Sequence, residues 1–229
     1  MRASHRLALL FAPRLTVPAG GTSMAERPMK QAAAEWEACR DAAAGCTRCH
    51  LYQNATQTVF GEGAVDARML FVGEQPGDRE DLAGKPFIGP AGQIFDRALG
   101  EAGIDRAKVY VTNAVKHFKF EQRGKRRLHS KPDAGEIEAC RWWLDKERAI
   151  IRPTLTIALG ATAGRAILGH PVTIGKLRGE VQQLADGSQG WVTVHPSYLL
   201  RIRDRDRAGQ EYDRFVAELK QAAEIAMRK

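Results

Sequence analysis

The stretch MLFVGEQPG, residues 69–77, decides the fold of this 229-residue chain. A short apolar run that a glycine stops predicts a buried β-strand followed by a tight loop. Similar runs predict strands at 109–112, 155–159 and 191–194, and helical patterns cover 31–44, 90–99, 133–152, 161–168 and 209–227. Strands that alternate with helices form parallel sheets covered on both faces. We therefore predict an α/β protein, a three-layer α/β/α fold around a central, mainly parallel four-stranded sheet.

Composition narrows the class of protein. Apolar residues make up 44% of the chain and charged residues 27%, which suits one well-packed domain. The net charge of +8 favours a polyanionic partner, and nucleic acid is the commonest one. No stretch approaches the roughly 20 apolar residues that span a bilayer, so we expect no membrane association and a cytoplasmic location.

The first 29 residues have the composition of a tail. Their apolar run at 7–12 is shorter than that of a signal peptide, and the charged Arg14 lies directly beyond it. We expect residues 1–29 to be disordered, or to be an over-extended start in front of Met24. The domain then comprises residues 30–229.

Polar motifs follow three of the four predicted strands, at 73–77, 113–117 and 195–197. The carboxyl ends of parallel strands meet at one edge of a sheet, and open sheets place their sites there. We therefore expect the chemistry of the protein to lie where these three segments converge.

The motifs resemble those of a known enzyme family. GEQPG at 73–77, GKPFIG at 84–89 and HPS at 195–197 resemble, in order, the loops of the iron–sulfur uracil-DNA glycosylases, and the likeness covers roughly residues 36–225. KRRLH at 125–129 is similar to the KRRIH loop of the UdgX-type branch, whose members stay covalently bound to their DNA product, and Gln75 also fits that branch. The resemblance implies a uracil-DNA glycosylase-like domain with a 4Fe-4S cluster. It would act as a monomer on uracil-containing DNA, single- or double-stranded.

The resemblance also implies roles in recognising and releasing the base. A glycosylase extrudes its target nucleotide into a pocket and reads the base by stacking and edge hydrogen bonds. Phe87 supplies a flat face, and Asn113 offers both a donor and an acceptor for uracil. His195 is expected to donate to uracil O2 as negative charge develops there, while Glu74 or Asp78 could position an attacking water. The remaining substrate-binding candidates are Gln75, Ser197 and Arg201.

The histidine of the basic loop is the implied nucleophile. In UdgX-type relatives this residue, here His129, attacks C1′ instead of water and forms a stable bond with the abasic site. The alternative is a conventional multiple-turnover glycosylase in which His129 only binds phosphate. Seven basic residues and one acidic residue lie between 116 and 131, a patch that favours salt-dependent DNA binding. The expected phosphate contacts are Lys125, Arg126, Arg127, Lys176 and Arg178.

Four cysteines predict a metal site in a reducing compartment. Cys46 and Cys49 form a Cys-x-x-Cys pair, and the resemblance implies Cys140 as a further ligand. Where the family usually has a fourth cysteine this chain has His117, and imidazole ligates iron in some iron–sulfur centres. We predict these four ligands, with Cys39 as the competitor for the fourth place. A zinc-containing DNA-binding module without catalysis is the remaining alternative.

Overall fold

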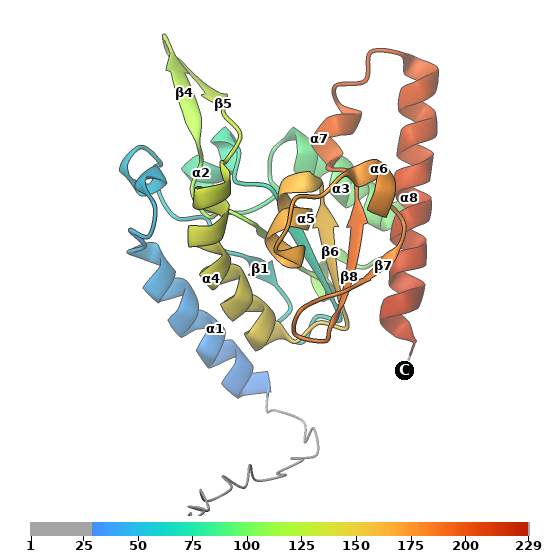
Figure 1. The fold of residues 1–229 in the computed structure, drawn as a ribbon, viewed down its shortest axis with the longest axis horizontal. Coiled ribbons are helices and arrows are strands. Elements are labelled where there is room, and N and C mark those ends of the chain that lie inside the picture. The colour runs from blue at the N-terminus through green and yellow to red at the C-terminus, as the bar shows by residue number, and fades with distance from the viewer. Residues whose placement is uncertain (1–28, 229) are drawn as a thin grey trace, which may run out of the picture.

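The computed structural model describes residues 29–228, and apart from Met29, which begins the first helix, the predicted tail lies outside the described residues. The chain folds around a six-stranded sheet with the order β1-β3-β2-β6-β8-β7 (Figure 1). Its strands are β1 (Glu62–Gly63), β2 (Met69–Gly73), β3 (Tyr110–Asn113), β6 (Leu155–Leu159), β7 (Val181–Gln183) and β8 (Gln189–Thr193). The four central strands are parallel, and β1 and β7 pair antiparallel at the edges.

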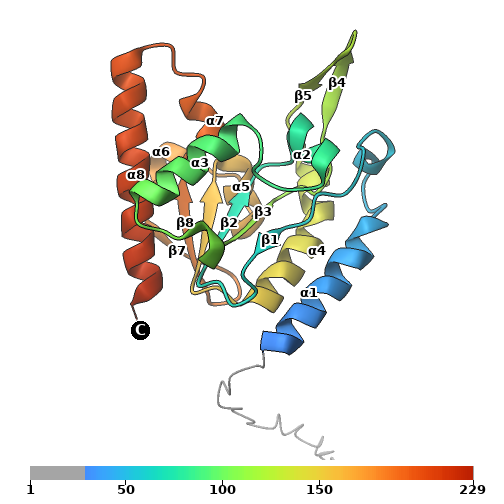
Figure 2. The same ribbon diagram turned by 180° about the vertical axis from the view of Figure 1, so that it is seen from behind.

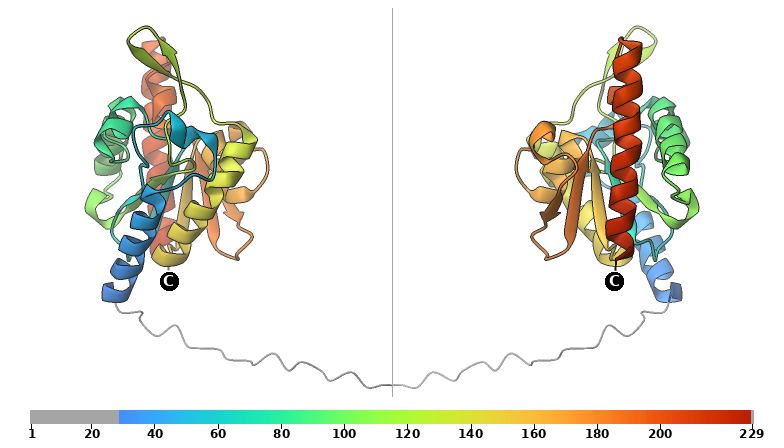
Figure 3. Two further views of the ribbon diagram at one scale, coloured as in Figure 1. Left: turned by 90° about the vertical axis from the view of Figure 1, so that its left-hand side faces the viewer. Right: turned by 90° about the vertical axis from the view of Figure 1, so that its right-hand side faces the viewer.

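Helices cover both faces of the sheet (Figures 2 and 3). On one face α1 (Met29–Ala44), α4 (Ala134–Ile151) and α5 (Ala161–Leu168) enclose one apolar core, and on the other α3 (Pro90–Glu101) and α8 (Arg205–Met227) enclose a second. The shorter helices are α2 (Asp78–Ala83), α6 (Ile174–Leu177) and α7 (Pro196–Leu199), with 3₁₀ turns at His50–Gln53 and Arg106–Lys108. None of the helices among the described residues is long and apolar enough to cross a membrane.

A buried ion pair fixes the segment that follows β3. Lys116 Nζ lies 2.5 Å from Glu147 Oε2, and neither side chain is exposed. The same ammonium donates to Thr112 Oγ1 at 2.6 Å and to the carbonyl oxygen of Asn113 at 2.8 Å. Because breaking one partner would leave a buried charge unpaired, the pair locks the end of β3 against α4. Lys116 therefore does not belong to the exposed basic patch.

The predicted fold class is confirmed, and the differences concern short elements. All four predicted strands are present, but β1 and β7 widen the sheet from four strands to six. These edge strands have only two and three residues, too few to produce a periodic pattern. Asp133 caps α4 as predicted, accepting from the backbone N–H of Glu136, whereas α8 begins at Arg205, four residues before the predicted start.

The basic segment predicted as a loop is a β-hairpin. Strands β4 (Phe120–Arg123) and β5 (Arg126–His129) pair antiparallel, and Gly124 turns between them with a positive φ of 59°. The hairpin projects beyond the carboxyl ends of the central strands (Figure 1). Phe120 pairs with His129 at its base, so His129 sits where the hairpin meets the body of the protein.

Candidate active site

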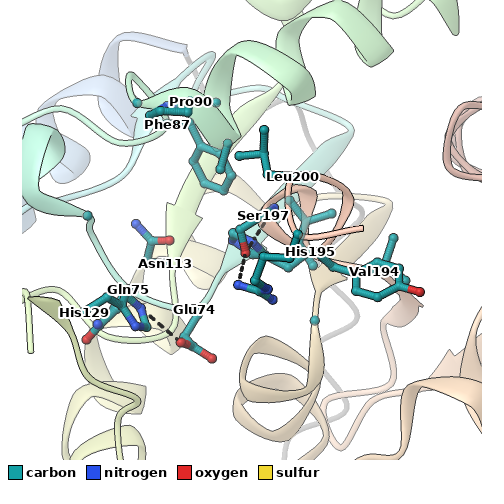
Figure 4. A pocket seen from close by; sticks show the side chains of 18 of the residues that line it. Glu74, Gln75, Phe87, Pro90, Asn113, His129, Val194, His195, Ser197 and Leu200 are labelled. Carbon is teal, nitrogen blue, oxygen red and sulfur yellow. Dashed lines mark hydrogen bonds and ion pairs between the residues drawn. The ribbon is translucent and has the colours of Figure 1, made fainter. Parts of the chain in front are cut away.

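A cavity of about 1090 Å³ opens at the carboxyl ends of the parallel strands. The three motif segments converge on it, and the hairpin contributes one edge (Figure 4). Among the predicted site residues, those lining it are Glu74, Gln75, Asp78, Phe87, Asn113, His129, Arg178, His195, Ser197 and Arg201. A cavity of this size holds more than a pyrimidine, so parts of the attached nucleotide fit as well.

Phe87 and Asn113 form one wall of the cavity on either side of Gly73. A β-carbon at Gly73 would lie 2.3 Å from Asn113 Oδ1 and 2.8 Å from Phe87 Cζ, so only glycine lets both side chains reach the cavity. Phe87 has a positive φ of 59°, a conformation that bulky residues rarely adopt and that functional sites often contain. Among the described residues no hydrogen bond to the Asn113 side-chain amide is recorded, which leaves its donor and acceptor for a ligand.

His195 faces Phe87 across the cavity as a neutral donor. The backbone N–H of Ser197 donates to His195 Nδ1 at 3.1 Å, so Nδ1 is an acceptor and the ring proton resides on Nε2. Ser197 Oγ lies 2.8 Å from the same nitrogen and accepts from Arg201 Nη1 at 3.2 Å. Burial lowers the pKa of His195 to about 4, because its effect is larger than that of the nearby Glu74 charge, which raises the pKa. At neutral pH the cavity therefore contains an uncharged imidazole with an N–H to donate.

Glu74 lies between the hairpin and α5. Its Oε1 is 3.3 Å from His129 Nε2, and its Oε2 accepts a short hydrogen bond from Thr162 Oγ1. Burial would raise the pKa of Glu74, but the hydrogen bonds from His129 and Thr162 outweigh this effect, and the pKa lies below its ordinary value. Glu74 is thus an ionised carboxylate beside a half-exposed imidazole.

Gln75 holds the base of the hairpin. Its amide oxygen accepts from the backbone N–H of Lys119 at 3.0 Å, and its amide nitrogen donates to the carbonyl oxygens of Lys119 and Ser130, both at 3.1 Å. The hydrogen bonds of its side chain join the two ends of the hairpin and so fix the placement of His129, while its predicted contact with a ligand stays a prediction.

Arg127 lies under the hairpin and not on its outer face. Its guanidinium is 2.6 Å from Asp78 Oδ1 and 2.6 Å from Asp81 Oδ2, and it stacks over the rings of Phe118 and Phe120. The predicted phosphate contact of Arg127 and the predicted water-positioning role of Asp78 do not match this geometry, because each group is already paired with the other.

Arg178 is also buried. It lies 2.6 Å from Glu211 Oε2 and 2.7 Å from Glu218 Oε1, and its side chain is only 7% exposed. Two carboxylates pair with it, while its Nη2 has no hydrogen-bond partner among the described residues, and the predicted phosphate contact stays a prediction. Lys125, Arg126 and Lys176 are exposed, as a phosphate contact requires.

Three of the predicted metal ligands lie together between α1 and α4. Cys46 and Cys140 are buried. Trp143 Nε1 donates to Cys46 Sγ at 3.0 Å, and the backbone N–H of Lys116 donates to Cys140 Sγ at 3.2 Å. Burial, against the lowering effect of Lys116 and with a smaller contribution from Cys49 and Cys46, raises the pKa of Cys140 to about 12. A positively charged metal group would reverse this by binding the thiolates.

His117 has one ring nitrogen available for a metal, as the predicted fourth ligand requires. Its Nε2 lies 2.9 Å from Thr58 Oγ1, while Nδ1 is buried without a hydrogen-bond partner among the described residues. Burial lowers its pKa, so the ring is neutral, the form that ligates metals. Cys39 has Glu147, Lys146 and Lys116 as its charged neighbours instead of the other cysteines.

The candidate ligands are not gathered around a single point in the described part of the chain. Within residues 29–228 no group of three or more His, Cys, Asp and Glu side chains is close enough to hold a single metal. An iron–sulfur cubane takes one ligand on each of four irons and so separates its ligands further. The thiols of Cys46, Cys49 and Cys140 and the unpartnered Nδ1 of His117 are donors of the kind that such a cluster takes.

Comparison with known proteins agrees with this geometry. The family model of the uracil DNA glycosylase superfamily matches residues 60–220, more than half of the chain. The chain belongs to the uracil-DNA glycosylase superfamily. The matched segment contains the cavity, the hairpin and both core-forming faces of the sheet.

The chain is similar to several type-4 uracil-DNA glycosylases. That of Thermotoga maritima is 41% identical over 162 residues, which cover 70% of this chain and 81% of the relative. That of Pyrobaculum aerophilum is 34% identical, with 68% and 80% covered, and that of Archaeoglobus fulgidus is 30% identical, with 80% and 89% covered.

The structure of this glycosylase-superfamily chain adds pocket residues that sequence reasoning missed. Glu80 accepts from the backbone N–H groups of Gly77 and Gly89 at 3.1 and 2.7 Å, and so joins the two glycine-rich loops. Leu200 is 51% exposed at the rim of the cavity (Figure 4). Thr162 lies on α5 behind the cavity lining and donates to Glu74 Oε2. Of these residues only Leu200 lies near a sequence signal, three residues after the HPS motif at 195–197.

Proposed function

We propose that this protein is a uracil-DNA glycosylase that excises uracil from DNA. The observation that carries the proposal is the meeting of Phe87, the unpaired amide of Asn113 and the neutral His195 in one cavity. The printed names of the relatives, type-4 uracil-DNA glycosylases, support the same substrate.

Each of the three side chains has a distinct task in this reaction. Phe87 stacks on the extruded base, and the Asn113 amide donates to uracil O4 and accepts from N3–H. As the glycosidic bond breaks, its electron pair moves onto uracil, and the Nε2–H of His195 stabilises the negative charge at O2. Half-exposed Leu200 is suited to enter the base stack and favour extrusion, as apolar wedges do in other DNA-bending proteins.

The finer proposal is that His129 traps the product. It is supported by the position of His129 at the cavity edge, 3.3 Å from Glu74, on a hairpin that Gln75 and Arg127 hold. The ring nitrogen that does not face Glu74 attacks C1′ while uracil leaves with the bonding electrons. Glu74 faces the resulting imidazolium and compensates its charge. Imidazole bonded to C1′ is a poor leaving group, so the enzyme stays attached.

The alternative is conventional multiple turnover, in which Glu74 positions a water molecule and His129 binds phosphate. The relatives' names favour this alternative, because they state glycosylase activity and nothing of a covalent product. The contact between His129 and Glu74 favours trapping.

One experiment separates the two. An oligonucleotide with a single uracil is incubated with the protein and run on a denaturing gel after heating in detergent. Uracil release with a heat-stable protein–DNA band supports trapping, whereas release without the band means turnover. A thymine oligonucleotide is the control, and no uracil release at all would refute glycosylase activity.

We also propose that the protein carries a 4Fe-4S cluster held by Cys46, Cys49, His117 and Cys140. Bound there, the cluster would tie the segment after α1 to α4 and to the segment that follows β3. The support is the orphaned Nδ1 of His117, the N–H donors on two of the sulfur atoms and the type-4 names of the relatives. The proposed DNA-backbone contacts are Lys125, Arg126 and Lys176.

A further inference from the structure

Thr162 makes a contact that neither the motifs nor the family match assigns. It lies in the first turn of α5, is 3% exposed, and its Oγ1 donates to Glu74 Oε2. Gly160 brings the chain from β6 into α5 with a φ of 93°, a value in the left-handed region that favours glycine, and thereby turns this helix start towards the cavity.

The two oxygens of Glu74 have different partners. Oε2 accepts from Thr162, and Oε1 faces His129 Nε2 at 3.3 Å. Without the threonine hydroxyl, the carboxylate could rotate and point either oxygen, or neither, at His129. The hydroxyl therefore determines which oxygen is presented to the imidazole and in which direction.

The surroundings also favour a charged Glu74. The groups that face it are Thr162 on α5, His129 on β5 and His195 before α7. The start of α5 adds the positive end of a helix dipole, which stabilises a nearby anion. The pKa of Glu74 lies below its ordinary value despite burial, in agreement with this arrangement.

We propose that Thr162 is a positioning residue that orients the Glu74 carboxylate towards His129, so that Thr162, Glu74 and His129 act as a hydrogen-bonded relay. This inference rests on the proposed trapping function of His129. The hydroxyl keeps one carboxylate oxygen aimed at one ring nitrogen, which leaves the other ring nitrogen with its lone pair towards C1′.

A second buried threonine provides a matched control. Thr156 on β6 is 1% exposed, and its Oγ1 has no hydrogen-bond partner among the described residues. Thr156→Val and Thr162→Val each replace a hydroxyl by a methyl group at a buried position. Only Thr162→Val removes a bond to Glu74, so a difference between the two variants reports that bond.

The experiment compares Thr162→Val, Thr162→Ser and Thr156→Val with the wild-type protein. The single-turnover rate of adduct formation on uracil DNA is measured across pH, and the Glu74 carboxylate is titrated by carbon NMR in the DNA-free protein. We expect Thr162→Val to slow adduct formation about tenfold or more at neutral pH, the usual scale for a hydrogen bond to a charged group. The acidic limb of its pH–rate profile and the midpoint of the Glu74 titration should both move to higher pH, because the ionised carboxylate loses a hydrogen-bond donor. Thr162→Ser and Thr156→Val should stay within about twofold of wild type.

Each other outcome has a definite meaning. Wild-type rate and wild-type Glu74 titration in Thr162→Val would overturn the inference, as would equal losses in Thr156→Val. If Thr162→Val does not fold, Thr162→Ala takes its place in both measurements. If wild-type protein forms no adduct, trapping fails, but the Glu74 titration in DNA-free protein still decides whether Thr162 controls this carboxylate.

Discussion

The guanidinium of Arg127 lies 2.6 Å from the carboxylate of Asp81, a side chain with no exposed surface. Asp81 also accepts from the backbone N–H of Thr56 with both oxygens, and Arg127 takes Asp78 as its second partner. One arginine of the hairpin thus fastens it to α2. The arginine that the sequence placed on the DNA is paired with two carboxylates of α2, two residues before His129.

Arg127→Met should lower the free energy of unfolding by about 3 kcal/mol, because it leaves the Asp81 carboxylate buried without a cation. Arg126→Met, one residue away and exposed, should change it by less than about 0.5 kcal/mol. Urea denaturation measures both. Equal stability of the two variants would show that the pair does not hold the hairpin.

Asn113→Asp should weaken uracil excision about 10- to 100-fold, since a carboxylate presents an acceptor to uracil O4 where a donor is needed. The same change should favour release of cytosine, whose exocyclic amine is a donor. Base release from matched uracil and cytosine oligonucleotides measures the switch. Unchanged uracil excision would remove Asn113 from base recognition.

The stability of the protein should depend on pH through His195. Its pKa is about 4 in the folded protein and ordinarily 6.5, so the unfolded chain binds the extra proton first. The free energy of unfolding should therefore be unaffected by His195 above pH 6.5. It should fall by about 3 kcal/mol as the pH falls from 6.5 towards 4. His195→Gln should lack this part of the pH dependence in urea denaturation. It should also slow excision about a hundredfold, the usual scale for a lost anion-stabilising donor.

His129→Ala should abolish the heat-stable adduct but retain uracil release, because Phe87, Asn113 and His195 still bind and polarise the base. His129→Ser or His129→Gly leaves room for water and should produce turnover. Mass spectrometry of the digested wild-type adduct should place the sugar on the peptide with Leu128 and His129. An adduct on a lysine that requires borohydride would indicate Schiff-base chemistry instead.

Purified protein should be brown and contain about four irons per chain. Cys140→Ala should lose iron and soluble yield together, since metal binding is coupled to folding. If His117→Ala keeps its iron and Cys39→Ala loses it, the fourth ligand is Cys39 and not His117. Stoichiometric zinc without iron would rule out the cluster.

The sequence by itself determined the parallel core and the position of the site. Apolar runs such as 69–72 and 155–159 bury both faces of their strands, and this local pattern requires no knowledge of distant partners. The motifs at 73–77, 113–117 and 195–197 then had to meet at the carboxyl ends of the strands. The cavity lies there.

Only the tertiary structure decided what individual polar residues do. Arg127 and Arg178 resemble DNA contacts in sequence, because charge in a sequence does not reveal burial, yet each is paired with two carboxylates from distant segments. Thr162 lies 88 residues from Glu74 and carries no motif, so their hydrogen bond exists only once β6 and β2 lie side by side. Local patterns determine which elements form. Partners far apart in the chain determine whether a charge faces DNA or orients its neighbour.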